Sequence, residues 1–220
     1  MSEGKGWTLI SRVSNNDGGK WGPLTNGGRE WWLHYGEAQN GEGTTTDPSQ
    51  NKDMVSRAFT LVSGTEFMIT RSDYPHTALL RTTNDCLGGQ TFRDKIRRSY
   101  YYGGFKDNQC RSSCSVTYGG LYTQTEGFEQ VNNNRCSMDS FHLQSGIGFW
   151  CFHAADEYEN GAVMMIGAGG VNCSGADHGI GVFEMKLGTN FIKKTEDFGN
   201  KVSKVGESPT KSYSLNLWVR

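Results

Sequence analysis

The closing stretch "SYSLNLWVR" (212–220) decides the fold class, because its apolar and polar residues alternate as they do in a β-strand. One face of such a strand would carry Tyr213, Leu215, Leu217 and Val219. The other face would carry Ser214, Asn216 and Trp218. A chain that ends on a strand of this kind usually ends inside a sheet, where its last residues are tied down. We therefore predict a sheet that includes this strand.

Further strands and one helix are indicated upstream. Strand patterns occupy residues 6–14, 142–154 and 161–170, and residues 58–73 are typical of two strands joined at "SGTE". The stretch "TFRDKIRRSYYYGG" (91–104) predicts a helix, since Phe92 and Ile96 recur at helical spacing and glycines end it. These elements predict a single α+β domain over residues 1–220, with β-sheets, few short helices and long loops.

Composition and charge exclude several classes of protein. The 220 residues include 30 glycines and 12% aromatic residues, which favours a compact, turn-rich globule over a disordered chain. The formal net charge of −1 offers no reason to expect nucleic acid or an anionic membrane as partner. The basic residues of 91–104 are accordingly interpreted as a solvated helix face. No apolar run is long enough to span a bilayer, so we expect no membrane insertion.

The six cysteines favour disulfide bonds and an oxidising compartment. The spacing in "CRSSC" (110–114) has no matching partner pair, which argues against a zinc site. We expect an extracellular protein, either secreted or displayed at a cell surface. The start "MSEGKGW" lacks the pattern of a signal peptide, which is expected of a mature chain or of one cut from a larger protein.

The candidate site lies in "VNCSGADHGIGVFE" (171–184), where acids and a histidine share a glycine-rich run. Calcium prefers six to eight oxygen ligands, and Asp177 and Glu184 supply carboxylates. An open coordination position on such an ion accepts two adjacent hydroxyl groups. His178 is suited to hydrogen-bond one of those hydroxyls. The alternative is a glycine-rich turn in which Asp177 caps backbone N–H groups.

Several segments, taken in order, resemble the intelectin (X-type lectin) branch of the fibrinogen-related domain superfamily. "GWTLISRV" (6–13) is similar to the first strand of fibrinogen-related domains, and "ALLRTTND" (78–85) is similar to a central intelectin segment. The more specific likeness runs through "CSGADHGIGVFE" (173–184), "EDFG" (196–199) and the closing strand. The resemblance implies a fibrinogen C-terminal-like, intelectin-like domain that is not an enzyme.

The same resemblance implies a lectin whose surface calcium ion binds a vicinal diol of a glycan. It assigns sugar contact to Asp177, His178 and Glu184, and the metal to these three together with Glu157 and Asp197. Two departures are visible. Ser174 stands where an asparagine ligand is expected, and "NKVSKVGESPTKS" (200–212) has no counterpart of the aromatic pair that walls the sugar. The sugar preference therefore does not carry over.

The sequence leaves other functions as alternatives to a lectin. The main alternative is a fibrinogen-related adhesion or protein-binding module whose calcium is only structural. An enzyme would use Asp177 and Glu184 as paired carboxylates, or Cys173 as a nucleophile, but this cysteine is expected to be oxidised. Most aromatic rings in proteins belong to the core, but some stack on sugars. The candidates for sugar stacking are Trp31, Trp32, Tyr100, Tyr101 and Tyr102. The sequence has no coiled-coil heptads, so a homo-oligomer would form through the domain surface or through flanking sequence.

Overall fold

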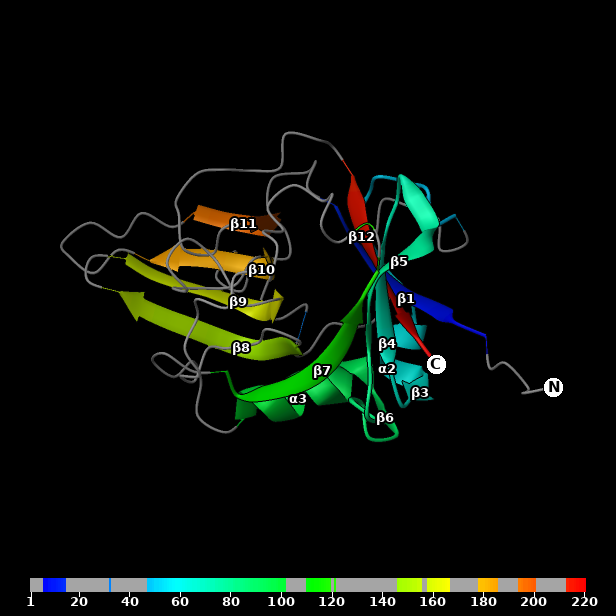
Figure 1. Ribbon diagram of the computed structural model, residues 1–220, viewed down its shortest axis with the longest axis horizontal. Helices are drawn as coiled ribbons and strands as arrows, with labels where there is room; N and C mark the ends of the chain where they lie inside the picture. The colour runs from blue at the N-terminus through cyan, green and yellow to red at the C-terminus, as the bar shows by residue number, and fades with distance from the viewer. Residues whose placement is uncertain are drawn as a thin grey trace.

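A single curled antiparallel sheet organises the protein, seen in a computed structural model (Figure 1). The structure describes residues 6–14, 32, 47–101, 110–119, 121, 146–155, 158–166, 178–185, 194–200 and 213–220. The sheet has ten strands in the order β11-β10-β9-β8-β7-β5-β4-β12-β1-β2. Their bounds are β1 (Thr8–Ser14), β2 (Met54–Val55), β4 (Phe67–Arg71), β5 (Tyr74–Thr82), β7 (Ser112–Tyr118), β8 (Gly146–Ala155), β9 (Tyr158–Ile166), β10 (His178–Met185), β11 (Lys194–Asn200) and β12 (Ser214–Val219).

The sheet bends at β7, and the bend divides it into two arms. Figure 1 shows β8, β9, β10 and β11 as one arm, with β1, β4, β5 and β12 as the other. We call the arm with β1, β4, β5 and β12 the first arm, and the arm with β8, β9, β10 and β11 the second arm. Strand β7 pairs with β5 of the first arm and with β8 of the second, so it carries the sheet from one to the other.

The closing strand lies inside the sheet, as predicted. Strand β12 pairs with β1 on one side and with β4 on the other. The carbonyl of Arg220 accepts hydrogen bonds from the N–H groups of Thr65 (2.8 Å) and Glu66 (3.3 Å). The chain end is therefore held by backbone bonds on a neighbouring segment.

The predicted α+β class is wrong, because strands dominate the described residues and the protein is mainly β. The described helices are α2 (Ala58–Leu61) and α3 (Phe92–Tyr101), and neither is long and apolar enough to cross a membrane. The predicted hairpin at "SGTE" is also wrong. Its first half forms α2, and the short strand β3 (Ser63–Gly64) pairs with β6 (Gln90–Thr91) instead of with β4.

Helix α3 confirms the helical prediction over Phe92–Tyr101, and residues 102–104 of the predicted stretch lie outside the described residues. Its first turn is capped by Thr91, whose hydroxyl accepts the N–H of Asp94 (3.1 Å) and donates to that residue's carboxylate (2.9 Å). Phe92 and Ile96 are fully buried. Trp150 of β8 is buried too, and its indole N–H donates to the Ile96 carbonyl at 2.8 Å. The helix is thus anchored to the second arm.

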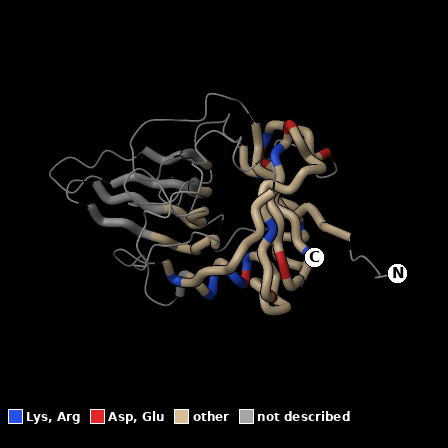
Figure 2. The backbone as a smooth tube through the Cα atoms, viewed as in Figure 1, with Lys and Arg blue, Asp and Glu red and all other residues tan. Residues whose placement is uncertain are grey.

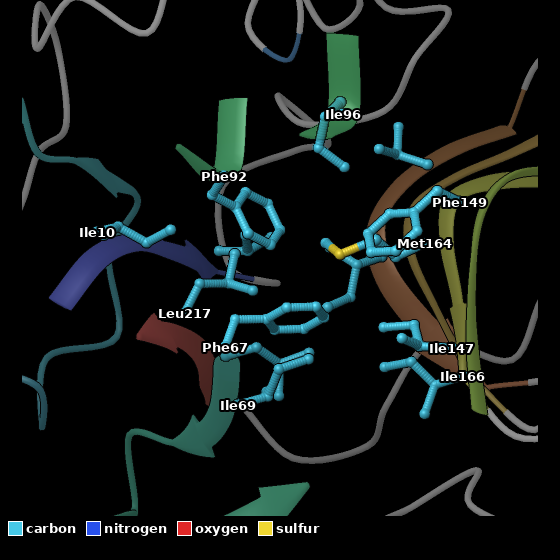
Figure 3. Close-up of a cluster of buried hydrophobic side chains, with 14 of the residues drawn as sticks. Ile10, Phe67, Ile69, Phe92, Ile96, Ile147, Phe149, Met164, Ile166 and Leu217 are labelled. Atoms are coloured by element: carbon cyan, nitrogen blue, oxygen red, sulfur yellow. The ribbon is translucent and has the colours of Figure 1, made fainter. Parts of the chain in front are cut away.

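The hydrophobic core fills the space between the two arms (Figure 3). Phe67 and Ile69 of β4 point across this space toward Ile147 and Phe149 of β8 in that view. The Phe67 ring lies 6.1 Å from the Phe149 ring and 5.1 Å from the ring of Phe92. The same few aromatic side chains therefore join both arms and α3.

Two disulfide bonds confirm the prediction that at least some of the cysteines are oxidised. Cys86 is bonded to Cys114, and Cys110 is bonded to Cys151. The second bond joins a residue two positions before β7 to the middle of β8. The other two cysteines, Cys136 and Cys173, lie outside the described residues.

Candidate functional site

The predicted site residues belong to the second arm, where backbone register fixes their order. His178 is the first residue of β10 and pairs with Ile166 of β9 and Asn200 of β11. Asp177 precedes it in the chain and lies outside the described residues.

Glu184 lies near the opposite end of β10. It pairs with Asn160 of β9 and with Lys194 of β11. Six residues separate His178 from Glu184, and the partner positions on β11, Asn200 and Lys194, are six residues apart as well. At about 3.3 Å per residue, the Cα atoms of His178 and Glu184 are about 20 Å apart.

That separation bears on whether the two residues can share an ion. A glutamate or histidine side chain plus one calcium–ligand bond spans about 7 Å from its Cα. Two such spans do not bridge about 20 Å of extended strand. The glycine-rich "GIG" does contain a left-handed residue, Gly181, with φ of 65°. The pairing on both sides of Gly181 nonetheless keeps one register, so β10 continues as a strand.

Glu157 is another of the predicted calcium ligands. It lies in the chain between Ala155 of β8 and Tyr158 of β9, which pair with each other, and is itself outside the described residues. Glu184 pairs with Asn160, which follows Tyr158 in β9.

Asp197 occupies an intermediate position. It lies in β11 between Glu196, which pairs with Val182, and Phe198, which pairs with Ile180. Of the five predicted ligands, His178, Glu184 and Asp197 are therefore placed as strand positions, whereas Asp177 and Glu157 lie outside the described residues.

A second cluster of polar groups surrounds Arg12 of β1, which is fully buried. Its Nε donates to the carbonyl of Lys52 at 2.6 Å and its Nη1 donates to the carbonyl of Asp47 at 2.7 Å. Burial lowers the pKa of the Arg12 guanidinium, and the nearby Asp47 and Asp53 act in the opposite direction. The guanidinium of Arg12 is the cation of this cluster, and it takes the place that a metal ion would have beside these oxygen atoms.

The same cluster binds the segment 47–53 to the strands of the first arm. Asn51 Oδ1 accepts hydrogen bonds from the hydroxyls of Ser14 (2.9 Å) and Ser214 (2.7 Å). Asp53 accepts the N–H of Ser14 at 2.7 Å. The arrangement is structural, because its donors and acceptors are directed at one another.

Replacing Arg12 with lysine should therefore destabilise the fold without touching the second arm. A single ammonium cannot reproduce the fixed fork that serves two carbonyls, so we expect a loss of about 1–3 kcal/mol in the free energy of unfolding. Urea denaturation measures it. Arg57→Lys, at an exposed position, is the matched control and should stay within about 0.5 kcal/mol. Equal losses in the two variants would contradict the assigned role.

The aromatic residues considered for sugar stacking divide between the core and undescribed positions. Trp32 is fully buried, and its ring lies 6.3 Å from the Phe59 ring. It therefore belongs to the core. Trp31 and Tyr102 lie outside the described residues, and Tyr100 and Tyr101 are placed only as positions in α3.

No protein-family model matches this chain, and no curated protein does. The likeness to intelectins therefore stays a hypothesis that rests on the residues quoted for it. Within the part of the chain that the structure describes, no three His, Cys, Asp or Glu side chains gather as they would around a metal. Asp177 and Glu157 lie outside that part of the chain.

One cluster was not foreseen from the sequence. The Trp7 ring lies 4.7 Å from the guanidinium carbon of Arg220 and 5.9 Å from that of Arg81. Arg220 also forms an ion pair with Glu66 at 2.9 Å. These residues come from both chain ends and from β5, so no local pattern brings them together. Cation–π contacts of this kind fasten the two ends of the chain to each other.

Proposed function

We propose that this protein is a calcium-dependent carbohydrate-binding protein that recognises vicinal diols of surface glycans. The observation that carries the proposal is the register of the second arm. Glu184 of β10 pairs with Asn160 of β9, and Glu157, which lies outside the described residues, precedes β9 in the chain. Carboxylate oxygens are the ligands that calcium prefers, and an ion at the edge of a sheet keeps positions open for two sugar hydroxyls.

The proposed calcium ion binds Glu157 and Glu184. Asp197, midway along β11, belongs to this proposal as a further acid, while His178 is the first residue of β10 and Asp177 precedes it in the chain. If the ion bound Asp177 and His178 instead, Glu184 would be about 20 Å away and would not matter. The two placements therefore make opposite predictions for single substitutions.

The compartment is part of the proposal. Two disulfide bonds are typical of proteins from oxidising environments, which supports an extracellular site of action where glycans are displayed. Lectins with shallow sites gain strength from several linked copies, so we also propose a homo-oligomer. No step of catalysis is assigned to any residue.

Removing one carboxylate should weaken calcium binding and sugar binding together. We expect Glu184→Gln to lower calcium affinity at least tenfold, because the neutral amide keeps the shape of the ligand and loses its charge. His178→Ala and Asp177→Asn should leave calcium affinity within about twofold. Calorimetry measures the calcium, and retention on beads that carry glycans with terminal vicinal diols measures the sugar, with and without EDTA.

The outcomes separate the hypotheses. A tenfold loss in Asp177→Asn with none in Glu184→Gln would move the ion to the beginning of β10. Binding to protein baits that is unchanged by EDTA and by sugar would favour the adhesion module with only structural calcium.

Lowering the pH should release the glycan, because carboxylates must be ionised to hold calcium. A thermal melt of each variant controls for folding.

A further inference from the structure

Trp150 of β8 has a backbone conformation that a bulky residue rarely adopts. Its φ is 50°, in the left-handed region, where the side chain of an L-residue is crowded by its own backbone. Asn84 and Asp85 also have positive φ, but short polar side chains tolerate that region. A tryptophan inside a strand does not belong to this tolerant class. Trp150 is therefore strained, and the surrounding structure must impose its conformation.

Contacts on several sides hold Trp150 in this conformation. Its side chain is fully buried, and its indole N–H donates to the Ile96 carbonyl of α3 at 2.8 Å. The residues before and after it, Phe149 and Cys151, both pair with β9. Cys151 is also bonded to Cys110. The disulfide bond is thus a covalent constraint directly beside the strained residue.

The neighbouring strand β10 has a left-handed residue at the same level of the sheet. Gly181 has a φ of 65°. The residues on either side of Trp150 and of Gly181 pair with the same two residues of β9, Met164 and Ala162. Strands β8 and β10 therefore leave the extended conformation together, and glycine does so without strain, whereas tryptophan does not.

The two described disulfide bonds differ in exposure. Cys110 is half-buried, whereas Cys86 and Cys114 are each only 8% exposed. A thiol reductant must reach a sulfur atom of the bond that it breaks. Because Cys151 is fully buried, attack on its bond falls on Cys110. The Cys110–Cys151 bond is therefore more open to reduction than the Cys86–Cys114 bond.

We propose that the Cys110–Cys151 disulfide is a redox-sensitive switch that controls the anchorage of α3. A thiolate of a dithiol reductant attacks Sγ of Cys110, the S–S bond breaks, and Cys151 leaves as a thiolate and takes up a proton. The second thiol of the reductant then attacks the reductant's own sulfur in the mixed disulfide and releases the Cys110 thiol. The reductant gives up two electrons and is left as a disulfide. Without the bond, Trp150 relaxes to extended backbone and its indole leaves the Ile96 carbonyl.

Reduction should loosen α3 without unfolding the first arm. Helix α3 loses the hydrogen bond between Trp150 and Ile96, which ties it to β8. Strand β12 is held by its pairing with β1 and β4, which the bond does not join. The switch does not rest on calcium or on glycan binding, so it is tested in EDTA, and the failure of either proposal leaves the other intact.

The test exposes the full chain to increasing dithiothreitol under native conditions in EDTA. Iodoacetamide then alkylates the free thiols, and peptide mapping identifies them. We expect Cys110 and Cys151 to become alkylated at least about tenfold faster than Cys86 and Cys114. Hydrogen exchange on the same samples should show the amides of α3 exchanging at least about tenfold faster once the first bond is reduced, with those of β12 within about twofold.

Two variants separate the role of the bond from that of the tryptophan. Cys110→Ala/Cys151→Ala should speed α3 exchange without any reductant, and the matched control Cys86→Ala/Cys114→Ala should leave it within about threefold. Trp150→Phe keeps a buried ring but lacks the N–H donor. Its α3 should exchange faster even with both bonds intact, and reduction should add little.

Three results would overturn the proposal. They are reduction of Cys86–Cys114 together with or before Cys110–Cys151, unchanged α3 exchange once Cys110–Cys151 is reduced, and a rise in β12 exchange equal to that in α3. The last would mean that the whole protein unfolds. If a thermal melt shows that Trp150→Phe does not fold, the reduction of the wild type still decides the question.

Discussion

Replacing Phe67 with alanine is expected to lower the free energy of unfolding by about 3–5 kcal/mol. The side chain is fully buried, and its ring packs against Phe92 of α3 at 5.1 Å and Phe149 of β8 at 6.1 Å. Alanine would leave a cavity at the point where α3 and the two arms meet, as Figure 3 shows. The surrounding side chains come from different elements, so they cannot collapse into the cavity together.

Guanidinium denaturation followed by tryptophan fluorescence would measure this loss. Leu61→Ala is the matched control, because that side chain is 73% exposed and should change stability by no more than about 0.5 kcal/mol. A loss below about 1 kcal/mol for Phe67→Ala would mean that the two arms do not share one core.

The elements that sequence patterns predicted well are those with a long, regular period. Strands β1, β8, β9 and β12 and helix α3 each lie in a segment for which that type of element was predicted. The partners of β12 were not predictable, because pairing depends on residues far away in the chain. Ser214 and Asn216 illustrate this. Both are polar and fully buried, since the segment 47–53 covers them and the Asn216 amide donates to the Pro48 carbonyl at 2.8 Å.

The errors arose where an element is too short to show a period. Helix α2 has only four residues, "AFTL", and an apolar run of that length suits a strand equally well. The α+β class was predicted because helices were expected to make up a larger share of the chain than they do. The sheet instead covers itself by curling, so that one arm packs its apolar face on the other.

The candidate site could be predicted only in part, because the sequence does not show which strands lie side by side. In sequence, Asp177, His178 and Glu184 look like neighbours in a glycine-rich loop. The structure makes residues 178–185 a strand, which separates His178 from Glu184 along its length. The pairing of Glu184 with Asn160 depends on the strand order β8-β9-β10, which no spacing in the sequence specifies. Figure 2 shows these strands beside one another in the second arm.

Removing the disulfide between Cys110 and Cys151 should cost about 4 kcal/mol, and removing that between Cys86 and Cys114 about 3.5 kcal/mol. The bonds close loops with sequence separations of 41 and 28 residues. The entropy that a bond removes from the unfolded chain grows only with the logarithm of loop length, so the two losses should be similar. Cys151 is fully buried beside Trp150, and serine there would add the cost of a buried hydroxyl. Alanine is therefore the better replacement.

The measurement compares Cys110→Ala/Cys151→Ala and Cys86→Ala/Cys114→Ala with the wild type by denaturation without reductant. Peptide mapping of the unreduced wild type should first recover both linked pairs. Reduced wild-type protein should be less stable than either variant, because it lacks both bonds at once. A variant that matched the wild type within about 1 kcal/mol would show that its bond constrains a loop already ordered in the unfolded chain. The β7–β8 junction that Cys110 and Cys151 join would then be held by its strand pairing, from Ser112 with Phe149 to Ser115 with Gly146.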